Sequence, residues 1–336
     1  MGKRAVQKGF RVAIVGATSL RGKELKELLA AGPLPVEKLT LLDDDEALGQ
    51  LTDYEGEPTF LQTIAPETFQ AGELVFFAST TPDFTRKHWH HAAAAHAVVI
   101  DLSHALLDEP GVTVRVAFLP KHQTGSALRC VVAPHPVVVV LLALLLPLHE
   151  RFGLVRAVAN VFEPVSERGL PAMDELQEQT VQLLSFQELP RAVFDAQLAF
   201  NLLAGYGSRS RLHLEEIESV VARELERCAP ELAARTALRF LQAPVFHGLA
   251  VSLWADFEHT PGIVAVETAL EGPRVRVTRQ DVTAPTVSDS AGCEDILVGP
   301  IVQDRSRTSA VWLWAVADNL RLAARNALEL AQDLAT

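Results

Sequence analysis

The stretch from Phe10 to Gly22 has residue types and a spacing that suit phosphate binding. Residues 12–15 form an unbroken apolar run, which is typical of a strand buried on both faces. Gly16 follows at once, and Thr18 or Ser19 can cap a helix whose leucines recur at helical spacing. A strand, a tight glycine turn and a helix predict the first unit of a dinucleotide-binding domain, where free N–H groups and the helix dipole favour a diphosphate.

The glycine pattern of this turn is incomplete, and two aspartates follow the next predicted strand. Ser19 occupies the middle glycine position, where the backbone approaches the phosphate. Asp43 and Asp44 end a strand predicted over residues 38–42, at the position that meets the adenosine ribose. A carboxylate there suits the free 2′-hydroxyl of NAD and repels the 2′-phosphate of NADP. A solvated acidic loop is an equal alternative. If a nucleotide binds, we expect NAD to be favoured over NADP.

Four histidines follow the segment Thr80-Thr81-Pro82, which should start a helix. They are His88, His90, His91 and His96. The first and third are three residues apart, a spacing that suits metal ligands, but no carboxylate or cysteine accompanies them. A solvated helix face is the better interpretation, so we predict no metal site.

The turn where a nucleophile would be expected carries none. Residues 133–140 read Ala-Pro-His-Pro-Val-Val-Val-Val and open a long apolar helix that extends to His149. A helix start at the carboxyl edge of a parallel sheet lowers the pKa of a nucleophile placed there. No Ser, Thr or Cys stands at this turn, and His135 is interpreted as a turn histidine.

The remaining pattern predicts two sheets with helices. Strands are expected at residues 12–15, 38–42, 73–78, 98–102, 114–119 and 129–132, and then at 153–162, 237–241, 248–257, 274–278, 297–302 and 310–317. An amphipathic helix over residues 171–185 should turn Leu176, Val181 and Leu184 inward. A second helix, over residues 214–225, carries glutamates that we interpret as a solvated face. A last helix is expected over residues 318–334.

Composition limits the class of protein. A chain of 336 residues fits two domains, and its formal charge of −12 argues against binding to nucleic acid or to anionic membranes. Cys130, Cys228 and Cys293 lie far apart in the sequence and lack metal-ligand spacing, so we interpret them as reduced, cytosolic thiols. The basic N-terminus leads straight into a strand, unlike a signal peptide. The longest apolar run, residues 137–146, is well short of the ~20 residues that span a bilayer. We therefore expect a cytoplasmic protein.

Motifs along the whole chain resemble those of aspartate-semialdehyde dehydrogenases. Five motifs occur in the same order and with the same spacing as in that family. They are Gly16-Ala-Thr-Ser, Val99-Ile-Asp-Leu-Ser103, Ala133-Pro-His-Pro136, Ala291-Gly-Cys-Glu-Asp-Ile-Leu-Val-Gly299 and Asp318-Asn-Leu-Arg321. The resemblance spans roughly residues 11–334. The chain most resembles the family's Usg-type members, which lack the catalytic cysteine.

The resemblance implies an α/β fold with two domains. Residues 1–133 would form a Rossmann-like NAD(P)-binding domain, completed by the C-terminal helix 318–336. Residues 134–317 would form an α+β domain that carries active-site residues and the dimer interface. Enzymes of this family reduce an aspartyl phosphate with NADPH through a cysteine thioester, in amino-acid biosynthesis. The positions that would contact the nucleotide are Gly16, Ala17, Thr18, Ser19, Leu20, Arg21, Asp43, Ala78, Ser79 and Asn319.

The sequence departs from the family wherever chemistry is done. Pro136 stands at the nucleophile, Leu249 at the acid/base histidine, and Leu107, Glu163 and Gln242 at substrate-binding positions. Proline has no nucleophilic atom, so no thioester can form.

Neighbouring residues do not restore these functions. His247 would share a strand face with position 249 but at ~6–7 Å. Arg239 would point to the opposite face from position 242, and Cys130 would lie inside a strand. A misplacement of ~1 Å can already cost ~100-fold in rate.

Two functions remain compatible with these observations. The first is a dimeric pseudoenzyme or interaction protein that has lost the dehydrogenase activity, with nucleotide binding open. The alternative is an NAD-dependent oxidoreductase of the semialdehyde dehydrogenase type that works without the family cysteine.

The strand predicted over residues 310–317 is apolar on both faces, which favours a homodimer. Trp312, Trp314 and Val316 share one face, and the residues between them share the other. The helices over residues 171–185 and 214–225 can cover one face only. A second copy of the chain can cover the other face, as the resemblance implies. The rival is that the loop 191–210 covers it within one chain.

Overall fold

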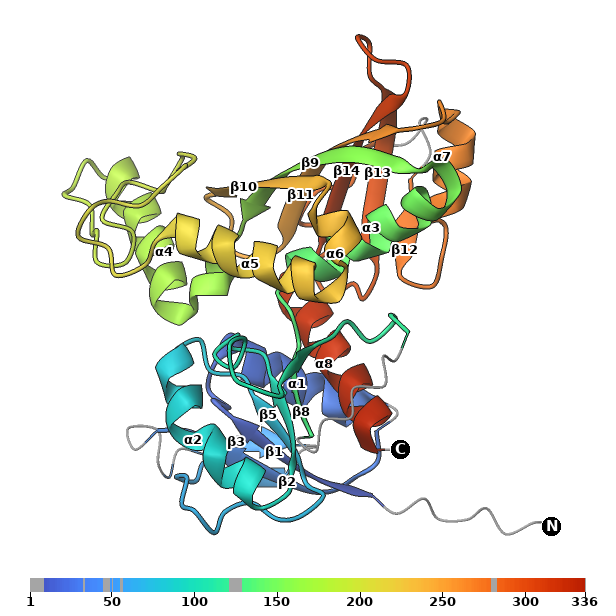
Figure 1. Cartoon of the computed structure of the whole chain (residues 1–336). Coiled ribbons are helices and arrows are strands. Elements are labelled where there is room, and N and C mark those ends of the chain that lie inside the picture. Colours follow the sequence, from blue (N-terminus) through green and yellow to red (C-terminus); the bar gives the residue numbers. More distant parts are fainter. Residues whose placement is uncertain are drawn as a thin grey trace. The chain divides into compact units, whose positions relative to one another are not determined.

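The computed structural model describes residues 9–32, 34–44, 49, 51–54, 57–120, 129–278 and 283–335. The chain divides into two compact units (Figure 1). Unit 1 contains residues 1–134 together with 323–336, and unit 2 contains residues 135–322. Among the described helices, none combines the length and the apolar character needed to cross a membrane.

Unit 1 is built on a parallel six-stranded sheet in the order β2-β1-β5-β6-β8-β7. Its strands are β1 (Phe10–Val15), β2 (Val36–Leu42), β5 (Leu74–Phe77), β6 (Val98–Asp101), β7 (Thr113–Val114) and β8 (Cys130–Val132). Its helices are α1 (Leu20–Ala31), α2 (Pro82–Ala94) and the end of α8 (Asn319–Ala335). Ala324, Ala327 and Leu330 of α8 belong to the same buried core as Val12 and Ile14 of β1. The last helix therefore completes the first unit.

Two predictions in unit 1 are wrong. The strand expected over residues 114–119 is limited to Thr113–Val114. The backbone N–H of Ala117 donates instead to the side chain of Asn326, and the chain turns at Val116, whose carbonyl accepts from Leu119. The second difference is a hairpin of β3 (Leu51–Tyr54) and β4 (Glu57–Phe60), for which no strand was predicted; Leu51 and Phe60 are exposed there, and Tyr54 packs partly buried against the core of unit 1.

Unit 2 contains a mixed six-stranded sheet in the order β10-β9-β11-β14-β13-β12. Its strands are β9 (Leu154–Glu163), β10 (Thr236–Gln242), β11 (Leu249–Phe257), β12 (Val275–Val277), β13 (Ile296–Gln303) and β14 (Ala310–Ala317). The helices packed against it are α3 (Pro136–Phe152), α5 (Leu214–Cys228), α6 (Pro230–Ala233) and α7 (Ile263–Leu270). A short 3-10 helix η2 (Val165–Arg168) and α4 (Leu170–Leu184) follow β9 (Figure 1).

Helix α4 does not cover the sheet as expected. Leu176 is buried, but Val181 and Leu184 are 57% and 69% exposed. The helix packs through its first half against η2 and the following loop, where Leu176 shares a core with Phe194 and Leu198. The loop 191–210 is thus drawn onto α4. The prediction that Val181 and Leu184 are buried is wrong, because only the first half of α4 packs against another segment of the chain.

The two faces of the unit 2 sheet differ in exposure. Leu253 and Leu313, paired across β11 and β14, are buried. On the opposite face Trp312 is 40% exposed, and its cross-strand partner Val302 is 49% exposed. The expectation of an open apolar face holds at Trp312 and Val302, whereas Val316 on the same face is buried in a cluster against which Val287 packs.

Candidate functional site

The glycine turn of unit 1 has the geometry of a phosphate-binding turn. Gly16 has φ +82°, and a Cβ there would lie 2.6 Å from the backbone N of Ser79. A Cβ on Gly22 would lie 2.3 Å from the carbonyl oxygen of Gly16. Ser19 is the N-cap of α1 and accepts from the N–H of Gly22 at 2.9 Å, while its Oγ donates to the carbonyl of Ala78 at 2.8 Å. Both glycines are therefore required, and the serine hydroxyl is held within the protein.

Asp43 is a structural residue of this turn. Its Oδ2 accepts from both the N–H and the hydroxyl of Thr18, each at 2.7 Å, and its Oδ1 accepts from the N–H of Asp44 at 3.1 Å. The side chain is buried, so a solvated loop does not describe it, whereas Asp44 is exposed. The carboxylate joins the end of β2 to the start of α1.

The other expected nucleotide contacts lie in two places. Ala17, Leu20, Ala78 and Ser79 surround the glycine turn in unit 1. Arg21 is buried and donates to the carbonyl of Leu102 at 2.7 Å, so it braces the sheet rather than facing outward. Asn319 lies in unit 2.

The segment after β6 is held by hydrogen bonds to Asp101, and its expected substrate-binding position, Leu107, is uncharged. Asp101 accepts from the N–H and hydroxyl of Ser103 and from the N–H of Leu106. Burial raises the pKa of Asp101, and these hydrogen bonds act against that rise. Leu107 is buried in the apolar interior and offers no charge for a phosphate.

In unit 2, a buried polar cluster forms around His135, the N-cap of α3. The backbone N–H of His135 donates to Glu224 Oε2 at 2.8 Å, and its Nδ1 accepts from the N–H of Val137 at 3.3 Å. Its Nε2 lies 3.0 Å from Glu163 Oε1 and 3.5 Å from Glu167 Oε2. The turn histidine is therefore confirmed in its place, but its surroundings are far more acidic than the sequence indicated.

A second layer of side chains holds Glu163. The guanidinium of Arg168 forms an ion pair with Glu163 Oε2, and Arg168 Nε donates to the hydroxyl of Tyr206 at 3.3 Å. Burial lowers the pKa of Arg168, but Glu163 and Tyr206 raise it more, so the net change is upward. Burial also raises the pKa of Tyr206. Both groups therefore keep their protons in the neutral pH range.

Gln242 and Asn319 complete this layer. The hydroxyl of Tyr206 donates to Gln242 Oε1 at 2.7 Å, and Gln242 Nε2 donates to the carbonyl of Glu163 at 2.8 Å. Asn319 Nδ2 donates to Glu167 Oε1 at 2.6 Å, and its Oδ1 accepts from the N–H of Gly248 at 3.0 Å. Gln242 is thus saturated by its neighbours, with no charge to offer a substrate.

The positions that the resemblance assigns to the nucleophile and to the acid/base group are apolar. Pro136 is the first residue of α3 and is buried, and Leu249 is only 1% exposed. His247 lies before β11 in an exposed turn, so its expected place on the strand beside position 249 is wrong. Arg239 pairs with Glu218 at 3.7 Å. Burial, with Asp101 and Glu109 nearby, raises the pKa of the Cys130 thiol to about 12, so this thiol is not a nucleophile.

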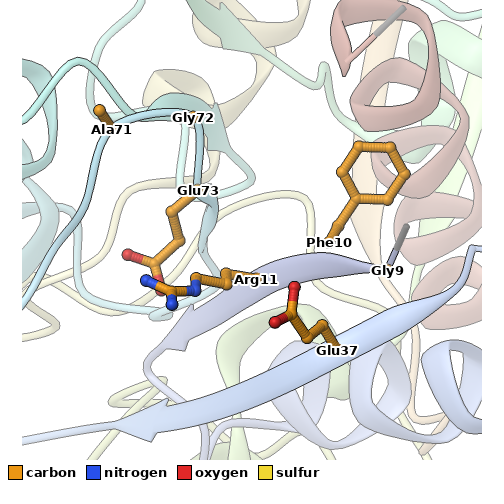
Figure 2. A pocket seen from close by; sticks show the side chains of 7 residues that line it. All are labelled: Gly9, Phe10, Arg11, Glu37, Ala71, Gly72 and Glu73. Carbon is orange, nitrogen blue, oxygen red and sulfur yellow. The ribbon is translucent and has the colours of Figure 1, made fainter.

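Two hollows lie outside these clusters. One, of about 510 Å³ in unit 2, is lined mainly by apolar groups, including Phe162, Ala250 and Trp314 on the open sheet face. The other, of about 290 Å³, lies in unit 1 beside Arg11 and Glu73 (Figure 2). It is at the amino ends of β1 and β5, opposite the edge where parallel sheets bind ligands.

Sequence reasoning missed Glu167, Arg168, Tyr206 and Glu224. Glu163, Glu167 and Arg168 are close in sequence directly after a strand, and that run of charges was a usable signal. Tyr206 and Glu224 lie in segments that no local pattern connects to β9. Glu224 is fully buried in α5, where a solvated glutamate face had been expected.

Comparisons with known proteins agree with this architecture. Residues 11–141 match the family model "Semialdehyde dehydrogenase, NAD binding domain", and residues 145–322 match "Semialdehyde dehydrogenase, dimerisation domain". A USG-1 protein homolog of Azotobacter vinelandii is 30% identical over 326 residues, covering 96% of each chain. An aspartate-semialdehyde dehydrogenase of Rickettsia bellii is 25% identical and covers 97% of this chain and 98% of its own.

Solved structures give the same result. The crystal structure of aspartate semialdehyde dehydrogenase II from Vibrio cholerae, complexed with ASA, superposes with a TM-score of 0.88 at 25% identity. It covers 97% of this chain and 98% of its own. With two family models that span most of its length, the chain belongs to the semialdehyde dehydrogenase family.

Proposed function

We propose that the protein is a dimeric member of its family that does not carry out the cysteine-dependent dehydrogenase reaction. One observation carries the proposal: Pro136 is the first residue of α3, at the position of the family nucleophile. A proline side chain has no atom that can attack a carbonyl or a phosphoryl-activated carboxyl group. The residues at this site therefore suit a scaffold or interaction protein better than a dehydrogenase.

Three other positions support the proposal. Gln242 is neutral and fully hydrogen-bonded, Leu249 is apolar, and Glu163 is a carboxylate paired with Arg168. A negatively charged cluster of this kind repels an anionic substrate such as an aspartyl phosphate. Restoring one residue therefore cannot restore the reaction.

The test is an assay of the purified full chain with aspartate semialdehyde, phosphate and NADP, followed by the absorbance of the reduced nicotinamide. We expect no rate above the protein-free control, and an authentic aspartate-semialdehyde dehydrogenase serves as the positive control. The variant Pro136→Cys should also be silent and should stay folded, because proline at the first helical position is favourable but not required. Turnover by the wild-type chain would refute the proposal.

We propose that the dimer forms through the open face of the unit 2 sheet. Trp312 and Val302 stay exposed there, and a two-fold partner presenting the same face would bury both. Light scattering coupled to size exclusion at micromolar concentration should give twice the chain mass. Trp312→Glu should shift the mass toward the monomer, whereas Val264→Glu, an exposed control on α7, should not. A monomeric wild type would contradict this interface.

The alternative is an NAD-dependent oxidoreductase that uses no cysteine. The glycine turn at Gly16 and Gly22 favours it, because both residues keep the geometry that a diphosphate requires. The two functions differ in whether the purified protein carries or tightly binds NAD(H). Cofactor release on denaturation, followed by absorbance and mass spectrometry, distinguishes them. A full equivalent of bound NAD(H) would favour the oxidoreductase.

A further inference from the structure

We propose that His135, Glu163 and Glu167 form a binding site for one divalent transition-metal ion. The candidate donor atoms are His135 Nε2 and one oxygen of each carboxylate, and all three lie within 4.8 Å of one another. Nε2 is 3.0 Å from the Glu163 oxygen and 3.5 Å from the Glu167 oxygen. Ligands at about 2.0–2.2 Å from a zinc-like ion are separated by about 3–3.5 Å, so the two distances from Nε2 suit a shared ion, and the carboxylate oxygens lie within 4.8 Å of each other.

The two carboxylates are held so that one oxygen of each faces the histidine. Arg168 binds the other oxygen of Glu163, and Asn319 donates to the other oxygen of Glu167 at 2.6 Å. Outer partners of this kind orient metal ligands in proteins. Glu163 is fully buried, and its Oε1 has no hydrogen-bond partner among the described residues. A buried carboxylate oxygen in that state is costly unless a cation or a donor meets it.

Charge gives a second reason for a cation. Glu163, Glu167 and Glu224 bring three buried carboxylates to His135, while the Arg168 guanidinium is ion-paired with Glu163. Removing several like charges from water is unfavourable unless positive charge accompanies them. A divalent ion at the three donor atoms would add positive charge beside Glu163 and Glu167 without displacing the hydrogen bonds from Arg168 or Asn319.

The donor set selects the class of ion. One imidazole nitrogen and two carboxylate oxygens, without a thiolate, suit Zn²⁺, Mn²⁺ or Fe²⁺ better than soft ions, and three protein ligands leave room for water. Binding requires the Nε2 lone pair, so the imidazole proton must reside on Nδ1. The 3.3 Å contact from the N–H of Val137 is then given up, which is tolerable because first-turn N–H groups often lack an intrahelical partner. The inference rests on this cluster alone and holds whether or not the dehydrogenase reaction is lost.

The experiment uses the full chain after treatment with a chelator. Titration with ZnCl₂ and, separately, MnCl₂ by calorimetry should show one equivalent for at least one ion, with a rise in the melting temperature. Glu167→Gln and His135→Asn should lower the affinity by about 100-fold or more, and Asn319→Ala by about 10–100-fold. Asparagine can still cap α3, so His135→Asn tests the imidazole rather than the helix. Glu167→Gln should melt no lower than wild type in the absence of metal, because it removes like-charge repulsion.

The matched control is the pair His88 and His91 on α2, which also have metal-ligand spacing. Their double replacement by alanine should leave the one equivalent intact. The proposal is overturned if the stripped wild type binds neither ion, or if Glu167→Gln binds as tightly as wild type. It is also overturned if the double histidine variant loses the site. Circular dichroism of each variant shows that a lost affinity does not reflect a lost fold.

Discussion

Two helix starts in this molecule, one in each unit, use opposite chemistry. At the start of α1, Ser19 caps the helix and Asp43 is fully used by the N–H and hydroxyl of Thr18. At the start of α3, His135 caps the helix in contact with the carboxylates of Glu163 and Glu224. At the start of α1 the polar groups are satisfied by neutral hydrogen-bond donors. At the start of α3 negative charge is concentrated in the interior of the protein.

The difference shows which family property each unit retains. Helix N-termini attract anions, and the glycine turn of unit 1 preserves that property with its backbone geometry. In unit 2 the carboxylates already occupy the region of the helix start, so an anionic substrate has no advantage there. Unit 1 thus keeps the glycine turn, whereas the helix start of unit 2 is surrounded by carboxylates.

Arg168→Met should give the largest effect, because it leaves Glu163 buried without its guanidinium partner. We expect a loss of about 3–5 kcal/mol in the free energy of unfolding, measured by urea denaturation at pH 7. Arg209→Met removes an ion pair with Asp195 in which the arginine side chain is 82% exposed, and it should cost much less stability than Arg168→Met. Equal losses of stability for the two substitutions would mean that the buried ion pair between Arg168 and Glu163 contributes no more than a surface ion pair.

Gly16→Ala should give the next largest loss of stability. This substitution tests the backbone geometry of the glycine turn. The added Cβ would lie 2.6 Å from Ser79 N at a positive φ, for a cost of about 3 kcal/mol. Gly72→Ala is the control, since Gly72 has a similar φ of +74° but no atom within 4 Å of a Cβ. It should cost only about 1–2 kcal/mol. A similar loss for both would assign the cost to φ alone and not to the close packing of the turn.

Asp43→Asn should change nucleotide preference and also lower stability, because the buried carboxylate accepts two hydrogen bonds from Thr18. The wild type should bind NAD more tightly than NADP, and weakly in both cases, because Ser19 stands at the middle glycine position, where the backbone would approach the phosphates. Removing the carboxylate charge should reduce the ratio of the NADP and NAD dissociation constants by about tenfold, or ~1 kcal/mol, in calorimetric titrations. Asp44→Asn is the neighbouring control. A wild type that prefers NADP would contradict the assignment.

Glu73→Gln should give the smallest effect, a gain in stability at neutral pH. Burial raises the pKa of Glu73, although the Gln70 N–H, Lys38 and Arg11 oppose the rise. With a folded pKa above the unfolded one, this group stabilises the fold most at low pH. That contribution is lost as pH rises from the unfolded pKa through the folded pKa. Glutamine can still accept from Gln70, so the gain in melting temperature over the wild type should be present at pH 7 and absent near pH 4. An unchanged pH dependence would contradict the raised pKa.

The sequence by itself determined most of the elements and the residue types at the positions that the resemblance assigns to catalysis. Unbroken apolar runs such as residues 12–15 and 98–101, the caps of α1 and α3, and the prolines at helix starts are local signals, because backbone propensity and burial act over a few residues. Pro136 and Leu249 could be identified from the motifs alone, since a missing nucleophile or imidazole is visible in the residue type itself.

Only the tertiary structure decided how the polar residues combine. Glu224, taken for a solvated glutamate, is buried beside His135, and Asp43, taken for a cofactor contact, closes a turn with Thr18. Tyr206 reaches Gln242 across a loop that carries no periodic pattern. Hydrogen bonds and charge pairs of this kind join residues tens of positions apart. Their energies depend on burial and on atomic distance, which sequence spacing does not encode.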